Sequence, residues 1–453
     1  MKKVLPLFLL LTAAAGFSFL CGFSYSAWRI IIFICSLVVL FIIGSLAFLF
    51  LFLSKNLPMK NSLLFSILGG GGFIGLHFLL SYIINSVAFK NAHPYVTALI
   101  TSGFTTLFFL VLSFLALHPI LEELKIGYIY QEPIPPSDKE SAPAAHITNR
   151  LYSSRWGVFI HYLHGVQNNP EHPSNISAGM TEWSACVNEL DVHLLAEQLH
   201  ESGAHFLYIT IMQGGRHMIA PNKTYDEITG MKPGEACAKR DLVLDLYDAL
   251  EPYGIDLYLY TTGDGPHADS VCGPKMGFVE GHVSKKFVNN WASVLREYAV
   301  RYGDKVKGWW IDGCYRARFG YTDELMKPYY DAVKESNPNA VVAFNNGVAN
   351  YYKKNYCNED YVCGEFNYFN VVPRSRFVDG AQTFLLAPLG QASDEKDLGL
   401  DWARPGTRYT GQYMRDFVSC CNKMGGVVAI DIGLKRDGSL YPEQLAVLKQ
   451  IEP

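Results

Sequence analysis

Residues 306–313 read VKGWWIDG, a strand-like apolar run that ends in one carboxylate, Asp312, and then in a glycine. Burying a carboxylate is costly unless a partner compensates its charge or a reaction uses it. In parallel α/β folds, catalytic side chains gather where strands end and loops begin. The stretch therefore predicts a buried strand whose carboxyl end belongs to a functional site.

Runs of the same kind recur along the second part of the chain, and amphipathic helical windows separate them. The windows at 191–203, 240–254, 285–303 and 321–336 have apolar residues at three-to-four spacing. Eight strand-helix units in about 300 residues predict an α/β fold, a (β/α)8 TIM-type barrel over 151–453. No GxGxxG or GxxxxGK[ST] motif occurs, which argues against a nucleotide-binding sheet. With 306–313, the predicted strands are 156–162, 205–212, 255–263, 340–346, 360–366, 381–387 and 425–433.

The first 118 residues have a different composition, with no Asp or Glu. They contain four apolar stretches, at roughly 4–23, 30–53, 62–89 and 95–117, each long enough to cross about 30 Å of hydrocarbon as a helix. Residues 1–118 are thus predicted to be an all-α, multi-pass transmembrane region of about four helices. The first stretch can also be a cleaved signal peptide, because MKK precedes it and TAAAG offers small residues.

Residues 119–150 are rich in proline and small polar residues, which predicts a connector between the membrane and the barrel. The side of the membrane on which the barrel lies stays open. The lysines around the first and second spans place the barrel in the cytoplasm by the positive-inside rule, whereas glycan substrates usually lie outside the cell. The lysines and arginine that enter this comparison are Lys2, Lys3, Lys55, Lys60, Arg29 and Lys90.

Polar side chains stand at the ends of the predicted strands, and a barrel would bring them to one mouth. Asp312 ends the fourth strand and Glu365 ends the sixth. Glycosidases need two such carboxyl groups, about 5–5.5 Å apart in retaining enzymes and about 6.5–9.5 Å apart in inverting ones. Nearby aromatic residues, among them Trp310, offer flat faces for a sugar ring. The other strand-end residues are His161, Gln213, Tyr260, Asp264, Asn345, Asn346 and Asp431.

Several motifs in the correct order resemble the catalytic barrel of the α-L-fucosidases, glycoside hydrolase family 29. WGVFIHY resembles the family's opening strand, TEW its EW pair, and SGAHFLYIT its second strand. VKGWWIDG resembles the strand that bears its nucleophile, and residues 425–451 resemble its closing segment. The resemblance implies a retaining glycoside hydrolase that releases a terminal sugar, and the predicted transmembrane region makes it membrane-anchored. The alternative is a catalytically degenerate barrel that acts as a membrane-tethered carbohydrate-binding or sensing module.

The resemblance also assigns roles. It implies Asp312 as the nucleophile and Glu365 as the acid/base, with Glu359 and Asp360 as rivals for the second role. It implies His161, Glu182, Trp183 and Tyr260 as sugar contacts.

The chain departs from the family after its second strand. TIMQGGRH places Gln213 and Gly214 where the family has a histidine pair, and Gly347 stands where an arginine usually follows the fifth strand. We expect no C-terminal β-sandwich of the kind common in the family. Gln213, His217 and Trp310 are therefore added as candidate sugar contacts, and the predicted sugar is fucose or a related one.

No metal or cofactor is expected. Asp264, His267 and Asp269 lie close together in sequence but lack a recognisable ligand cage. The expected partners are a carbohydrate substrate and, through the N-terminal helices, membrane lipid; nucleic acid is not expected, and the oligomeric state stays open. Trp402 is interpreted either as an aromatic lid over the mouth or as a packing residue. A transporter role for the membrane part is disfavoured, because no charged residue lies within a predicted span.

Overall fold

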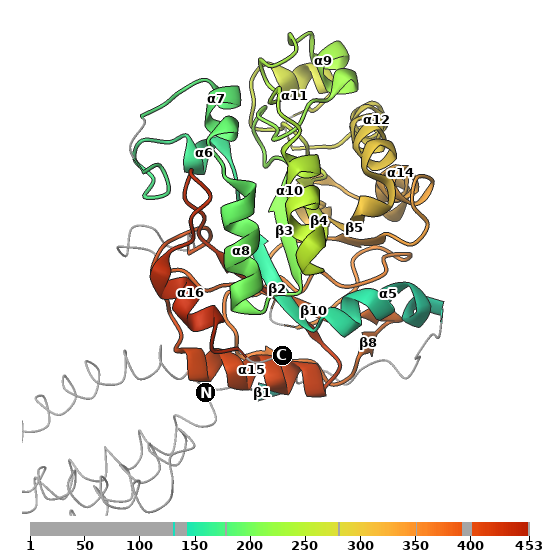
Figure 1. The fold of residues 1–453 in the computed structure, drawn as a ribbon. Helices are drawn as coiled ribbons and strands as arrows, with labels where there is room; N and C mark the ends of the chain where they lie inside the picture. The colour runs from blue at the N-terminus through green and yellow to red at the C-terminus, as the bar shows by residue number, and fades with distance from the viewer. Residues whose placement is uncertain are drawn as a thin grey trace, which may run out of the picture. The chain divides into compact units, whose positions relative to one another are not determined.

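A parallel sheet of seven strands, in the order β10-β11-β2-β3-β4-β5-β6, forms the centre of the structure (Figure 1). The computed structural model describes residues 130–131, 143–176, 179–279, 281–349, 351–391 and 401–451. Seven of the eight predicted strands are thereby confirmed. Their bounds are β2 Trp156–Ile160, β3 Phe206–Thr210, β4 Asp256–Thr262, β5 Val306–Asp312, β6 Val341–Phe344, β10 Phe384–Pro388 and β11 Val427–Ile432.

The predicted sixth strand, 360–366, is not a regular strand. Its residues make isolated bridges to the β10 side, and the Asp360 amide donates to the Val342 carbonyl of β6 at 2.9 Å. Gly364 has a φ of +55°, and a Cβ there would lie 1.8 Å from the Phe384 carbonyl oxygen. This kink breaks the pairing pattern, so the prediction of eight regular strands is corrected to seven strands and one bridging segment. With this segment between β6 and β10, the sheet fits a (β/α)8 barrel.

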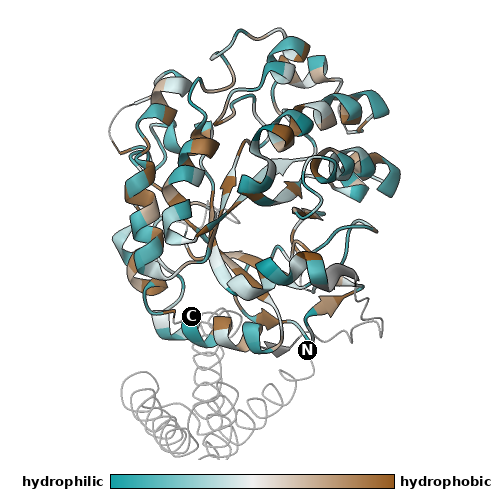
Figure 2. Ribbon diagram, turned by 45° about the vertical axis from the view of Figure 1, so that its right-hand side comes forward, coloured by the Kyte–Doolittle hydropathy of each residue, from teal (hydrophilic) through white to brown (hydrophobic). Residues whose placement is uncertain are grey.

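Helices surround the sheet, and several of them begin with a side-chain cap, for example Asp191, Ser284 and Thr322. Figure 2 shows hydrophilic and hydrophobic residues mixed on these helices and mainly hydrophobic residues on the strands. The four predicted helical windows are confirmed as α8, α10, α12 and α14. The longer helices are α5 Pro143–Ser154, α8 Val192–Ser202, α10 Leu242–Leu250, α12 Lys285–Tyr302, α14 Asp323–Lys334 and α15 Gly411–Lys423, and the shorter α16 covers Pro442–Leu448.

Short elements decorate the connections. β1 (Tyr130–Gln131) pairs in parallel with β7 (Val371–Val372), and β8 (Phe377–Val378) pairs with β9 (Ala381–Gln382). The short helices are α6 His164–Gln167, α7 Trp183–Asn188, α9 Lys223–Thr229, α11 Cys272–Met276, α13 Arg316–Phe319, and the 3-10 turns η2 Glu251–Tyr253 and η3 Gly303–Lys305.

Aromatic side chains fill the interior of the barrel. Phe159, Tyr208, Tyr260 and Trp310 belong to one buried cluster with apolar residues of every strand of the sheet. Alternate residues of a strand point to the same face, so this cluster is the inward-facing set. The Tyr208 hydroxyl donates to the Tyr361 hydroxyl at 3.0 Å, which satisfies polar atoms inside the core. The floor beneath the carboxyl ends of the strands is thus apolar and tightly packed.

Helix α5 (Pro143–Ser154) closes the amino-terminal end of the barrel. Its Leu151 is buried in the interior cluster, and Arg150 donates two hydrogen bonds of 2.6 Å to Asp256 at the start of β4. This helix begins within the stretch predicted as a connector, 119–150, so part of that stretch belongs to the folded barrel. The helix begins at Pro143. A proline is tolerated in the first turn of a helix, because the N–H group there has no partner within the helix.

The predicted transmembrane region, residues 1–118, lies outside the described residues. In the part of the chain that the structure describes, no helix is both long enough and apolar enough to cross a bilayer. The membrane assignment therefore stays a prediction.

Arg436 organises the loop that follows β2. Its guanidinium is fully buried and binds Glu189 at 2.6 and 2.7 Å, Thr181 at 2.7 Å and Asn168 at 3.1 Å. The loop that carries one wall of the barrel mouth is thus tied to the segment after β11.

Replacing Arg436 by alanine is expected to lower the free energy of unfolding by about 2–4 kcal/mol, because it removes a fully buried guanidinium together with its hydrogen bonds to Glu189, Thr181 and Asn168. Denaturant unfolding of the full chain in detergent, followed by tryptophan fluorescence, measures the change. The control is Arg296→Ala, which removes an exposed ion pair with Glu335 and should cost less than about 1 kcal/mol. Equal effects of the two variants would contradict a stabilising role for the Arg436 hydrogen bonds.

Candidate active site

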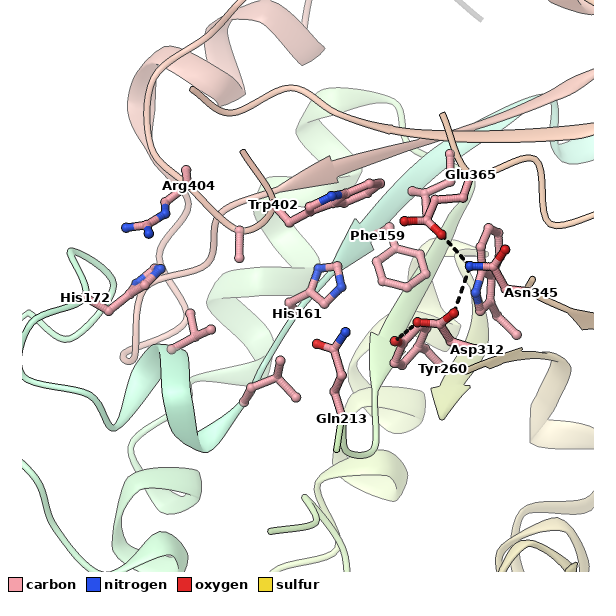
Figure 3. A pocket seen from close by; sticks show the side chains of 15 residues that line it. Phe159, His161, His172, Gln213, Tyr260, Asp312, Asn345, Glu365, Trp402 and Arg404 are labelled. Carbon is pink, nitrogen blue, oxygen red and sulfur yellow. Dashed lines mark hydrogen bonds between the residues drawn. The ribbon is translucent and has the colours of Figure 1, made fainter. Parts of the chain in front are cut away.

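A pocket of about 270 Å³ opens where the strands of the sheet end (Figure 3). Six of the nine residues predicted to form the site line it: His161, Gln213, Tyr260, Trp310, Asp312 and Glu365. The remaining lining residues are Phe159, Leu163, Val166, His172, Asn345, Leu386, Trp402, Ala403 and Arg404. The structure therefore brings the predicted carboxylate pair and most of the predicted sugar contacts to one place.

Asn345 connects the two carboxylates. Its amide nitrogen donates to Asp312 Oδ1 at 2.8 Å and also to Glu365 Oε2. Because both hydrogen bonds, of about 3 Å each, meet at one nitrogen, the two acceptor oxygens lie no more than about 6 Å apart. The Tyr260 hydroxyl donates to the other oxygen of Asp312 at 2.6 Å. Asp312 thus accepts hydrogen bonds on both oxygens, as an ionised carboxylate does.

Glu365 has a strongly perturbed acidity. Only part of its side chain faces the pocket, and the burial of the rest, together with the nearby charge of Asp312, raises the pKa of Glu365 to about 8. The hydrogen bond from Asn345 acts in the opposite direction, because it favours the charged form. At neutral pH, Glu365 is mainly protonated beside a carboxylate that accepts hydrogen bonds.

Replacing Asn345 by alanine is expected to reduce turnover of a hydrolysed glycoside by about 10- to 100-fold, because its hydrogen bonds to the carboxyl groups of both Asp312 and Glu365 are lost. Loss of the donor removes the interaction that lowers the pKa of Glu365, so the alkaline limit of activity moves to higher pH. A pH profile of kcat/KM tests both effects. The neighbouring Asn346, exposed and outside the pocket, gives the matched alanine control; a shift to lower pH in Asn345→Ala would contradict the assignment.

His161 is oriented by a buried carboxylate, Asp431. Its Nδ1 lies 2.6 Å from Asp431 Oδ1, and Asp431 is fully buried. The second oxygen of Asp431 accepts the Ala403 amide at 2.8 Å, so one carboxylate positions both His161 and the segment that begins at Trp402. The Trp402 ring lies 5.9 Å from the His161 ring, lines the pocket and packs against the barrel core. Both interpretations of Trp402 therefore have support.

Three predicted sugar contacts lie away from the pocket. Trp183 is buried, and its Nε1 donates to the Met218 carbonyl at 2.7 Å. The His217 ring stacks on His164 with centroids 4.0 Å apart, and burial lowers the pKa of His217 to about 4. Glu182 is exposed immediately before α7. These side chains shape the surrounding loops, and none of them lines the cavity.

The two other candidates for the acid/base role, Glu359 and Asp360, make contacts outside the pocket. Glu359 is buried and accepts the Phe344 amide at 3.0 Å, and Asp360 pairs with Lys334 at 2.8 Å. Neither residue lines the pocket. Glu365 is therefore the carboxyl group that faces Asp312.

The structure adds residues to which the sequence analysis assigned no role. Asn345 was recognised as a strand-end residue, and its FNNG context was the available signal, but its bridging position depends on β5 and the 360–366 segment. His172 and Arg404 come from loops after β2 and β10, and no sequence pattern brings these loops together.

The acidic side chains of the loop after β4 have basic partners. Asp269 pairs with Arg216 at 2.6 Å, and His267 lies 3.1 Å from Asp264. Across the described part of the chain, no group of three or more His, Cys, Asp and Glu side chains could hold a metal ion.

No protein-family model matches the sequence, and neither does any curated protein. Among solved structures, an endo-fucoidan hydrolase of glycoside hydrolase family 107 matches with a TM-score of 0.51 at 14% identity, over 69% of this chain and 64% of that one. An α-L-fucosidase of family 29 from Bacteroides thetaiotaomicron matches with a TM-score of 0.47 at 18% identity, over 72% of this chain and 76% of that one. The first likeness shows that the barrel described above is a fold that a glycoside hydrolase uses.

Proposed function

We propose that this chain is a membrane-anchored, retaining glycoside hydrolase that acts on fucose or a related sugar. The observation that carries the proposal is the Asp312–Asn345–Glu365 arrangement, in which one amide bridges an acceptor carboxylate and a protonated carboxyl group. The short separation between the two groups favours the retaining geometry over the wider inverting one. The sequence motifs shared with α-L-fucosidases support the choice of sugar.

The first step is attack of an Asp312 oxygen on the anomeric carbon. The bond from that carbon to the leaving oxygen breaks, and Glu365 gives its proton to the leaving oxygen. The product is a glycosyl ester of Asp312 and an ionised Glu365. Burial and the charge of Asp312 hold Glu365 in the protonated form that this step requires.

The second step reverses the roles. Esterification removes the negative charge of Asp312, so one cause of the raised pKa of Glu365 disappears and this residue becomes a suitable base. Glu365 takes a proton from water while the water oxygen attacks the anomeric carbon and displaces Asp312. The sugar leaves with its original anomeric configuration, and both carboxyl groups return to their starting states.

Around this pair, the described pocket offers contacts for the sugar ring. His161, oriented by Asp431, presents an imidazole edge, and Gln213 offers an amide in place of the family's histidine pair. Trp402 and Phe159 supply apolar faces. Since hydroxyl recognition sets the choice of sugar, these substitutions are where a departure from fucose would arise.

Hydrolysis of a panel of aryl α- and β-glycosides, α-L-fucoside included, by the full chain in detergent tests this function. The expected result is turnover of one sugar. Sugar binding without turnover, unchanged in Asp312→Asn, would instead identify the alternative, a tethered carbohydrate-binding module.

Under this proposal, the first 118 residues hold the enzyme in a membrane. After cell lysis, the full chain is expected to sediment with membranes, resist extraction by high salt and alkaline carbonate, and dissolve in detergent. Release by carbonate alone would contradict an integral anchor. Protease digestion of sealed vesicles then reports the side on which the barrel lies.

A further inference from the structure

A second cavity, of about 610 Å³, adjoins the active-site pocket and shares His172 and Arg404 with it. We propose that this cavity binds a second saccharide unit, joined to the non-anomeric side of the sugar that Asp312 attacks. The substrate is then an oligosaccharide or polysaccharide cut next to a substituted sugar, and not a single terminal sugar as the sequence predicted. This inference rests on the proposed glycosidase function.

The position of the second cavity determines how the saccharide lies across the active site. Figure 3 shows Asp312 and Glu365 at one end of the pocket, His172 and Arg404 at the other, and His161 between them. The anomeric carbon must lie at Asp312 and the leaving oxygen at Glu365. The side of the ring opposite the anomeric carbon therefore points past His161. A substituent on a hydroxyl of that side enters the second cavity.

The lining of the cavity suits a carbohydrate. Its polar residues include Asn169, Glu171 and Gln391, whose planar groups donate or accept pairs of hydrogen bonds from neighbouring hydroxyls. Its other side chains include prolines, which limit loop motion and offer small apolar faces. The volume lies within the range of about 300–1,000 Å³ that is usual for ligand sites, whereas the first pocket alone falls slightly below it.

Buried hydrogen bonds hold the wall that follows β2. The Arg436 amide donates to the Ser174 carbonyl at 2.9 Å, and the Ser174 amide donates to His172 Nδ1 at 3.1 Å. The Ser174 hydroxyl lies 3.2 Å from the Tyr441 hydroxyl. This wall is therefore formed before any sugar arrives.

The opposite wall follows β10 and is fixed in a similar way. The Gln444 amide donates to the Arg404 carbonyl at 2.7 Å and to the Gly406 carbonyl at 2.9 Å. The Ala403 amide ties the same segment to Asp431, the partner of His161. Because both walls are preorganised, binding a second unit requires little ordering of the protein.

The test compares two chromogenic substrates of the full chain in detergent: 4-nitrophenyl α-L-fucoside and the 4-nitrophenyl glycoside of an α-linked L-fucose disaccharide. We expect kcat/KM for the disaccharide to be at least about tenfold higher, since a few added hydrogen bonds supply that factor. We also expect mass spectrometry to show release of the intact disaccharide. Release of single fucose units, or equal kcat/KM for the two substrates, would overturn the inference while leaving the glycosidase function in place.

Variants locate the effect. Glu171 and Gln391 are exposed and come from opposite walls. The double variant Glu171→Ala/Gln391→Ala is expected to lower the disaccharide-to-monosaccharide ratio of kcat/KM by about tenfold. The control is Glu251→Ala, which removes an exposed glutamate of η2, before β4, and should leave the ratio unchanged. An unchanged ratio in the double variant would overturn the assignment of this cavity, and turnover of neither substrate would overturn the proposed function as well.

Discussion

Replacing Asp312 by asparagine is expected to reduce kcat by about four orders of magnitude or more, because an amide oxygen is too weak a nucleophile to attack the anomeric carbon. Asparagine keeps the shape of the side chain and can still accept a hydrogen bond from Tyr260, so the barrel should remain folded. Steady-state hydrolysis of the best aryl glycoside in the panel, with the circular dichroism spectrum as a check on folding, measures the effect.

The matched control for Asp312 is Asp248, an exposed aspartate of α10. Asp248→Asn should retain wild-type turnover. A second variant, Asp312→Gly, removes the side chain and leaves room for a small anion. Added azide should then restore turnover and yield a glycosyl azide of inverted configuration. Full activity in Asp312→Asn would refute the role of this residue.

Replacing Glu365 by glutamine is expected to lower kcat by about 10²- to 10⁴-fold for substrates whose leaving group needs protonation. The loss should be smaller for nitrophenyl glycosides, because nitrophenolate leaves without a proton. The first step requires protonated Glu365, and its raised pKa keeps it protonated below about pH 8. Wild-type activity should therefore fall as the pH rises through about 8, and this alkaline limb should disappear in the variant.

Glu359→Gln provides the comparison for this prediction, because Glu359 is a nearby buried glutamate that does not line the pocket. It should retain the alkaline limb. The opposite pattern, with the limb lost in Glu359→Gln and kept in Glu365→Gln, would transfer the acid/base role to Glu359.

The sequence was most informative where a local pattern has one structural solution. VKGWWIDG and GGVVAIDIG are continuous apolar runs, and in a parallel sheet such runs are buried strands with their terminal polar residues at one edge. Asp312 and Asp431 could therefore be placed at the mouth of the barrel. The 360–366 segment reads as a strand by the same criterion, but its irregular path depends on how closely Gly364 approaches the Phe384 carbonyl, which composition does not encode.

Side chains in loops were harder to place. Trp183 was assigned to the sugar by motif position, and His217 was added because the family's histidine pair is missing. The two rings pack on each other and on His164 outside the cavity. His172 and Arg404 are far apart in sequence and meet only because β10, β11 and β2 are neighbours in the sheet. Such juxtapositions come from tertiary structure, so no local pattern predicts them.

The anomeric configuration of the first product, followed by ¹H NMR during hydrolysis of the best substrate by the full chain, shows whether Asp312 is the nucleophile of a double displacement. Double displacement through Asp312 predicts that the sugar is released with the configuration of the substrate, before mutarotation mixes the anomers. Release of the inverted sugar would refute this role of Asp312, because water and not Asp312 would then attack the anomeric carbon.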